Sequence, residues 1–271
     1  MKGDSHMNLN KYLADPAEKP LERIVDDGGF TSIFRTIGCI GDSLSSGEFE
    51  STNPEGTEKG YHDYFEYSWG QYIARAAGCK VINFSRGGMT AIEYMQSFAD
   101  ANDFWNPDKL CQAYIIALGV NDLYGRKMPV GSIEDINAED PEKNADTFCG
   151  WYAKIIQRLK TMQPKAKFFL MTMPRGRKEG DEQILAHRNL LHDLEKFFDY
   201  TYVLDFTEYA PVYDDEFKKK FYLGGHMNPA GYILTAKMTM SYIDYIIRHN
   251  MEDFAQVGFI GKDVHNYTAK W

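Results

Sequence analysis

Long apolar runs, an excess of basic residues and paired cysteines are all missing from this sequence. No stretch approaches the about 20 apolar residues that a membrane-spanning helix needs, and no basic start is followed by an apolar signal segment. The chain has 30 Lys and Arg against 39 Asp and Glu, a net charge of -9. Because binding a polyanion needs basic surface, we do not expect nucleic acid as a partner, and the lack of a long apolar segment argues against a membrane.

The four cysteines are far apart and form no Cys-x-x-Cys pair; they are Cys39, Cys79, Cys111 and Cys149. We predict buried, reduced thiols and a cytoplasmic location. His187 and His192, five residues apart on one predicted helix, do not share a face, so no metal site is expected. No cofactor is expected either, and the sequence leaves the oligomeric state open.

Length and composition favour one domain. Of the 271 residues, 44% are hydrophobic and 14% aromatic, which is sufficient for a sizeable core. Residues 1–7 resemble an expression leader with a tag remnant, so the predicted domain covers residues 8–271.

Short β-rich runs alternate with amphipathic stretches along the chain. This alternation is typical of βαβ crossovers, which build a parallel sheet covered by helices on both faces. The predicted strands are residues 35–40, 80–84, 113–118, 167–173 and 201–206. The predicted helices are residues 64–77, 91–99, 147–162, 181–198 and 229–248, the last with Asn228 as its N-cap. Two long connections, residues 44–63 and 123–146, follow motif residues and are expected to wall a cleft.

Gly41-Asp42-Ser43 stands where the first apolar strand ends, the edge at which open α/β sheets carry their chemistry. Alone it is also an ordinary turn. Similar motifs follow later strands: Asn83 with Gly88, then Gly119-Val120-Asn121-Asp122, and finally His226 ahead of Asn228-Pro229. A serine, a histidine and several hydrogen-bond donors are what acyl transfer requires: a nucleophile, a general base and an oxyanion hole.

In these four blocks the chain resembles the SGNH hydrolases, also called the GDSL esterase and lipase family. The Ser, Gly, Asn and His of that name fall on Ser43, Gly88, Asn121 and His226, with Gly87 as the next choice for the glycine. The resemblance implies a three-layer α/β/α sandwich with a central five-stranded parallel, flavodoxin-like sheet. It also implies ester hydrolysis without a cofactor, with Ser43 and His226 catalytic and with Ser43, Gly88 and Asn121 forming the oxyanion hole.

One position departs from the family pattern. The family usually has an Asp three residues before the histidine, and here that residue is Leu223. Either His226 works in a dyad, held by a backbone carbonyl, or an acid arrives from elsewhere. Asp205 is the first candidate for that acid, followed by Glu208 and Asp214.

The sequence favours a serine hydrolase of short acyl esters, with an acetylated carbohydrate as the natural target. Polar long loops and the lack of an extended exposed apolar segment support the short acyl group. Two alternatives stay open: a carbohydrate-binding protein that has lost catalysis, for which Leu223 is the best support, and an acyltransferase that uses the same serine.

Overall fold

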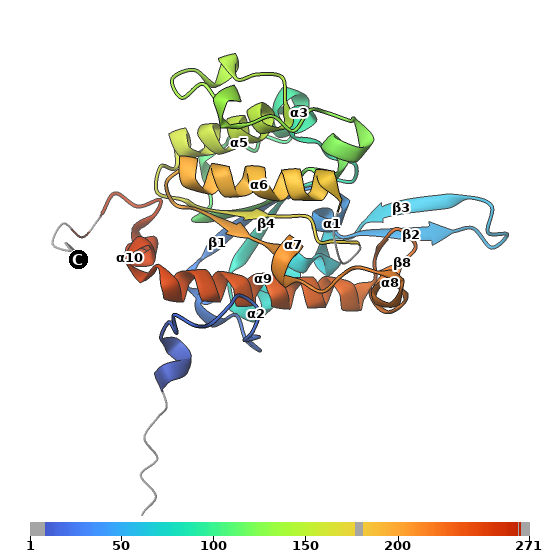
Figure 1. The fold of residues 1–271 in the computed structure, drawn as a ribbon, viewed down its shortest axis with the longest axis horizontal. Helices are drawn as coiled ribbons and strands as arrows, with labels where there is room; N and C mark the ends of the chain where they lie inside the picture. Colours follow the sequence, from blue (N-terminus) through green and yellow to red (C-terminus); the bar gives the residue numbers. More distant parts are fainter. Residues whose placement is uncertain (1–8, 177–180, 265, 267–271) are drawn as a thin grey trace, which may run out of the picture.

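A central parallel sheet organises the molecule (Figure 1). The computed structural model describes residues 9–176, 181–264 and 266, so the predicted leader, residues 1–7, lies outside the described residues. The five strands of the central sheet have the order β4-β1-β5-β6-β7, the flavodoxin-like arrangement. The strands are β1 Thr36–Gly41, β4 Lys80–Ser85, β5 Ala113–Ala117, β6 Lys167–Met171 and β7 Thr201–Leu204. All five predicted strands are confirmed, with ends that differ by two residues at most.

Helices cover both faces of this sheet, which makes the predicted three layers (Figure 1). On one face, α2 Trp69–Ala77 and α9 Pro229–His249 bury apolar side chains against the sheet. On the other, α3 Ala91–Glu93, α5 Phe148–Met162 and α6 Glu182–Phe197 do the same. Neighbouring strand residues alternate between the two cores, because side chains of a strand point to opposite faces.

The helix ends follow local capping rules. Asn228 accepts a hydrogen bond from the Gly231 N–H at 3.0 Å and Pro229 opens α9, as predicted. Gly78 ends α2 at φ +66°, also as predicted. The predicted helix 64–77 starts later, at Trp69, because Ser68 caps α2 and the preceding residues form a 3-10 turn. The predicted helix 91–99 is interrupted by the π-helical turn η4 Tyr94–Phe98 and ends in α4 Ala99–Ala101.

The first long connection is more regular than expected. It folds into the short helix α1 Ser43–Ser46 and an antiparallel hairpin, β2 Glu48–Thr52 with β3 Lys59–Asp63. Figure 1 shows this hairpin extending away from the sheet at the end where β1 finishes.

The segment after β7 is also structured, with α7 Phe206–Tyr209, α8 Asp215–Phe221 and a small hairpin of β8 Tyr222–Leu223 with β9 His226–Met227. The second long connection holds the π-helical turn η6 Asn121–Gly125 and the 3-10 turns η7 Ile133–Asp135 and η8 Pro141–Lys143. The remaining elements are η1 Leu9–Tyr12, η2 Gly29–Ile33, η3 Phe65–Tyr67, η5 Pro107–Lys109, α10 Met251–Phe254 and η9 Val257–Phe259.

Within the described part of the chain, no helix has both the length and the apolar character to span a membrane.

Candidate active site

Ser43 is the first residue of α1, one position beyond the N-cap Asp42. The turn between β1 and α1 is tight: a Cβ on Gly41 would lie 2.1 Å from the Ser45 Oγ, so only glycine fits there. Asp42 caps α1 by accepting the Leu44 N–H at 3.1 Å. The sequence thus folds locally so that Ser43 sits at the carboxyl end of a central strand.

Asp42 is buried, and burial raises the pKa of its carboxyl from the ordinary 3.8 to about 7. Asp122 raises this pKa further, whereas the Leu44 N–H and His226 lower it. Asp42 therefore lies close enough to His226 and Asp122 for the charge of each to affect its pKa.

Two backbone N–H groups beside Ser43 have no acceptor among the described residues: its own and that of Gly88. Gly88 has φ +73°, a left-handed conformation that favours glycine. The Gly87 N–H, by contrast, is directed at Asp63 Oδ2 at 3.4 Å. Of the two glycines considered from the sequence, Gly88 is the one whose N–H is available.

Asn121 begins the turn that follows β5. Its Nδ2 donates to the Met89 carbonyl at 3.1 Å and makes a longer contact, 3.5 Å, with Asp42 Oδ2. The next residue, Asp122, is buried and accepts the Ala91 N–H at 2.8 Å; burial raises its pKa to about 6. These bonds tie the loop after β5 to the loop after β4.

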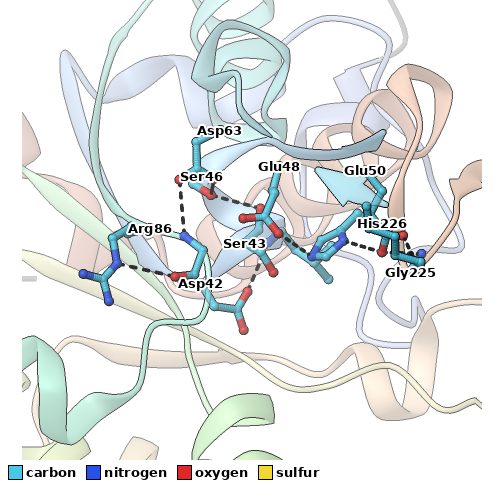
Figure 2. Close-up of polar contacts among 12 residues, drawn as sticks. Asp42, Ser43, Ser46, Glu48, Glu50, Asp63, Arg86, Gly225 and His226 are labelled. Atoms are coloured by element: carbon cyan, nitrogen blue, oxygen red, sulfur yellow. Dashed lines mark hydrogen bonds and ion pairs between the residues drawn. The ribbon is translucent and has the colours of Figure 1, made fainter. Parts of the chain in front are cut away.

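His226 lies on β9, and β9 is in contact with both α1 and β2. Both ring nitrogens face carboxylates of β2: Nδ1 is 3.0 Å from Glu50 Oε1, and Nε2 is 3.0 Å from Glu48 Oε1. Figure 2 shows the imidazole between these two glutamates, with Ser43 on the Glu48 side. The structure thus brings together Ser43, Gly88, Asn121 and His226 at one edge of the sheet.

The sequence does not predict the acids beside His226, Glu48 and Glu50, because residues 44–63 are expected to form a long loop. Glu48 and Glu50 are 178 and 176 positions from His226, and no local spacing connects them. A usable signal was present: Glu48-Phe49-Glu50 alternates polar and apolar residues, and Asn53-Pro54-Glu55-Gly56 is turn-forming.

The expectation that Asp205 reaches His226 is wrong. Asp205 Oδ2 instead accepts a hydrogen bond from Arg188 Nε at 2.8 Å and lies 3.0 Å from His192 Nε2. Burial alone would raise the pKa of Asp205, but the bonds from His192 and Arg188 lower it, and the same contact raises the pKa of His192 to about 9. The two reserve candidates are also engaged elsewhere: Asp214 caps α8, and Glu208 lies 3.9 Å from Arg188.

A cavity of about 330 Å³ lies beside the nucleophile turn. Apolar side chains form most of its wall, among them Trp69, Met171, Phe206, Tyr213 and Met227. Asp42 and Leu44 border it, whereas Ser43 and His226 do not. Across the described residues, no group of three or more His, Cys, Asp or Glu side chains could hold a metal ion.

The flavodoxin-like sheet carries a serine at the end of β1, a glycine N–H without an acceptor after β4, Asn121 after β5 and a histidine before α9. Together these features define an SGNH-type hydrolase fold. The GDSL-like lipase/acylhydrolase family matches residues 39–234, and the chain belongs to that family. No curated protein matches it.

Solved structures share this fold at low identity. A family two carbohydrate esterase from Clostridium thermocellum, in complex with cellohexaose, has a TM-score of 0.54 and 17% identity, covering 87% of this chain and 66% of its own. A carbohydrate esterase family 2 enzyme with a carbohydrate-binding domain, from Corynascus thermopiles (Myceliophthora fergusii), has a TM-score of 0.54 and 17% identity, with coverage of 77% and 65%. A Lactobacillus plantarum protein has the same TM-score and identity, with coverage of 78% and 97%. The chain thus spans about two thirds of the two esterases.

Asp205→Asn should lower the melting temperature and leave the titration of His226 unchanged. The amide keeps the α7 cap but cannot neutralise Arg188 and His192, a loss of about 1–3 kcal/mol because both partners are partly solvated. Thermal unfolding and NMR titration of His226 measure the two effects. A shifted His226 titration would return Asp205 to the active site.

Asp42→Asn should stabilise the protein at high pH. Because folding raises the pKa of Asp42 from 3.8 to about 7, the wild type loses stability as pH rises through that window, and a neutral Asn does not. The asparagine still accepts the Leu44 N–H. Each pKa unit is worth about 1.4 kcal/mol, and each kcal/mol shifts the melting temperature by about 2–4 °C in a domain of this size. The variant should therefore melt several degrees above the wild type at pH 8 and close to it at pH 4; a lower melting temperature at pH 8 would contradict this account.

Proposed function

We propose that this protein is a serine ester hydrolase that works through an acyl-serine. Ser43 is the nucleophile, His226 the general base and acid, and the Ser43 N–H, the Gly88 N–H and Asn121 Nδ2 form the oxyanion hole. The observation that carries the proposal is the pair of N–H groups without acceptors beside Ser43, at the edge where β9 brings His226 against α1.

Ester hydrolysis by this route needs only these groups and water. Ser43 Oγ attacks the ester carbonyl carbon while its proton passes to His226 Nε2, and the carbonyl oxygen takes the negative charge. The bond to the alcohol then breaks as Nε2 returns the proton to the departing oxygen. Water attacks the acyl-serine by the same route and releases the carboxylic acid and free Ser43.

Short acyl esters, with an acetylated carbohydrate as the natural target, remain the proposed substrate class. Exposed tyrosines on and just after the hairpin, Tyr61, Tyr64 and Tyr67, support a sugar because their rings offer an apolar face beside a polar hydroxyl. The carbohydrate esterases of similar fold support the same choice. The apolar cavity does not include Ser43 in its wall, so an acetyl group needs no part of it.

We also propose a cytoplasmic location. All four cysteines are free, and Cys39, Cys111 and Cys149 are buried, which suits a reducing compartment.

Ser43→Ala should abolish release of p-nitrophenol from the acetate ester, because no nucleophile is left to form the acyl-enzyme. Wild type and variant are compared at equal concentration after circular dichroism shows that both are folded. Octanoate ester serves as the second substrate, and a preference for it would overturn the short-acyl class and assign the apolar cavity to the chain.

Turnover by the variant equal to that of the wild type would refute Ser43 as nucleophile. Inactivity of both proteins on every ester, with binding of a glycan, would favour the carbohydrate-binding alternative. Transfer of the acetyl group to an added sugar in place of water would identify an acyltransferase.

Asn121→Ala should lower kcat by about 100- to 1,000-fold, the usual effect of removing one oxyanion donor. Among the described residues, the side chain makes one short bond, to the Met89 carbonyl, so the melting temperature should change by a few degrees at most. Steady-state kinetics and thermal unfolding measure the two quantities. An Asn121→Ala protein of normal activity would exclude Asn121 from the oxyanion hole.

A further inference from the structure

Two carboxylates of one strand hold the two nitrogens of His226. Glu48 and Glu50 are two residues apart on β2, so their side chains point to the same face of the hairpin, where β9 lies against it. The two contacts are equal in length, 3.0 Å each, but they engage different nitrogens, and only Nε2 can exchange a proton with Ser43 in the proposed reaction.

We propose that Glu50 is the positioning residue that orients His226 through Nδ1, in place of the acid that Leu223 cannot supply, and that Glu48 occupies Nε2 until substrate arrives. The proposal rests on the proposed function and names the part that each glutamate plays in it.

The surroundings of Glu50 are built to hold it in place. Its Oε1 accepts the Gly225 N–H at 2.7 Å as well as facing Nδ1, and its Oε2 accepts Lys59 Nζ at 3.2 Å. Burial raises the pKa of Glu50, but the bonds from His226, Lys59 and Gly225 outweigh it and lower the pKa. Glu50 therefore stays ionised, as an orienting acid must.

The glycines before His226 leave room for this carboxylate. A Cβ on Gly224 would lie 2.3 Å from Glu50 Oε2, and one on Gly225 would lie 2.5 Å from Oε1. Leu223 pairs directly opposite His226 in the small hairpin, and its side chain is half exposed. Glu50, from another element, thus supplies the carboxylate that Leu223 cannot.

Glu48 is held differently. Its Oε1 makes an ion-pair contact with His226 Nε2 at 3.0 Å, and among the described residues its carboxylate makes no hydrogen bond. It also packs against the second glycine loop, since a Cβ on Gly87 would lie 2.0 Å from its Oε2. Burial raises the pKa of Glu48, the opposite direction from Glu50. A carboxylate held only by this ion-pair contact competes with the Ser43 hydroxyl for Nε2 and can be displaced.

The charged and titratable groups that face His226 are Glu48 and Glu50 on β2, Tyr61 on β3 and Asp42 before α1. Lys59 and Asp63 act on it through the two glutamates. Removing either negative charge makes protonated His226 less stable, so both Glu→Gln variants should shift the acid limb of the rate profile to lower pH. Loss of the orienting acid should reduce the plateau above that limb much more than loss of Glu48.

The test compares Glu50→Gln with its matched control Glu48→Gln. For p-nitrophenyl acetate, Glu50→Gln should lower the plateau of kcat by roughly 100-fold or more with a small change in KM. Glu48→Gln should lose much less of that plateau than Glu50→Gln, because Nδ1 keeps its hydrogen bond to Glu50. Thermal unfolding checks that both variants are folded, and Glu50→Asp, which keeps the charge, should recover part of the loss.

A plateau of Glu50→Gln within twofold of the wild type, or an equal loss in both variants, would overturn the proposal. NMR of the His226 imidazole tests it without turnover: in Glu50→Gln the Nδ1 proton should lose its downfield shift, and in Glu48→Gln it should keep it. If the wild type hydrolyses no ester, the proposed function fails, and this spectrum alone decides whether Glu50 holds Nδ1.

Discussion

The parallel pairing of β1 with its two neighbours is the constraint on which the whole site depends. Gly41 of β1 is in register with Ser85 of β4 and with Ala117 of β5, so the loops after these strands begin side by side at one edge of the sheet. Ser43, Gly88 and Asn121 come within a few residues of these strand ends. Because parallel strands all end at one edge, three parts of the chain that are far apart in sequence supply one site.

The sequence predicts the parts of this arrangement that depend on local chemistry. Apolar runs bounded by turn residues locate the strands, and Asn228-Pro229 locates the start of α9 because capping is a property of adjacent residues. The positions of Ser43, Asn121 and His226 follow, since each stands at such a boundary. The interruption of the segment after Thr90 by η4 was not predictable in this way, because tertiary packing decides where a helix widens into a π turn.

The acid beside His226 shows where local reasoning ends. Leu223 excludes the expected neighbour, and Asp205 looked suitable because it ends β7 at the same edge. Yet Arg188 and His192 on α6 neutralise Asp205, so its placement at the edge serves stability. Glu50 reaches the histidine only because a hairpin folds back over β9, and hairpin placement depends on contacts far apart in the chain. A position at the sheet edge is thus not sufficient to place an acid beside the histidine, and Glu50 comes from a separate hairpin.

Burial and hydrogen bonding separate the acids around the site into two kinds. Glu50 has several donors and remains charged, whereas Asp42 and Asp122 are buried with few donors, so burial raises their pKa values. A histidine that must accept a proton from serine needs one fixed charge at Nδ1; further fixed charges nearby would hold it protonated. The raised pKa of Asp42, about 7, reduces its negative charge at neutral pH, whereas Glu50, with a lowered pKa, keeps its charge beside Nδ1.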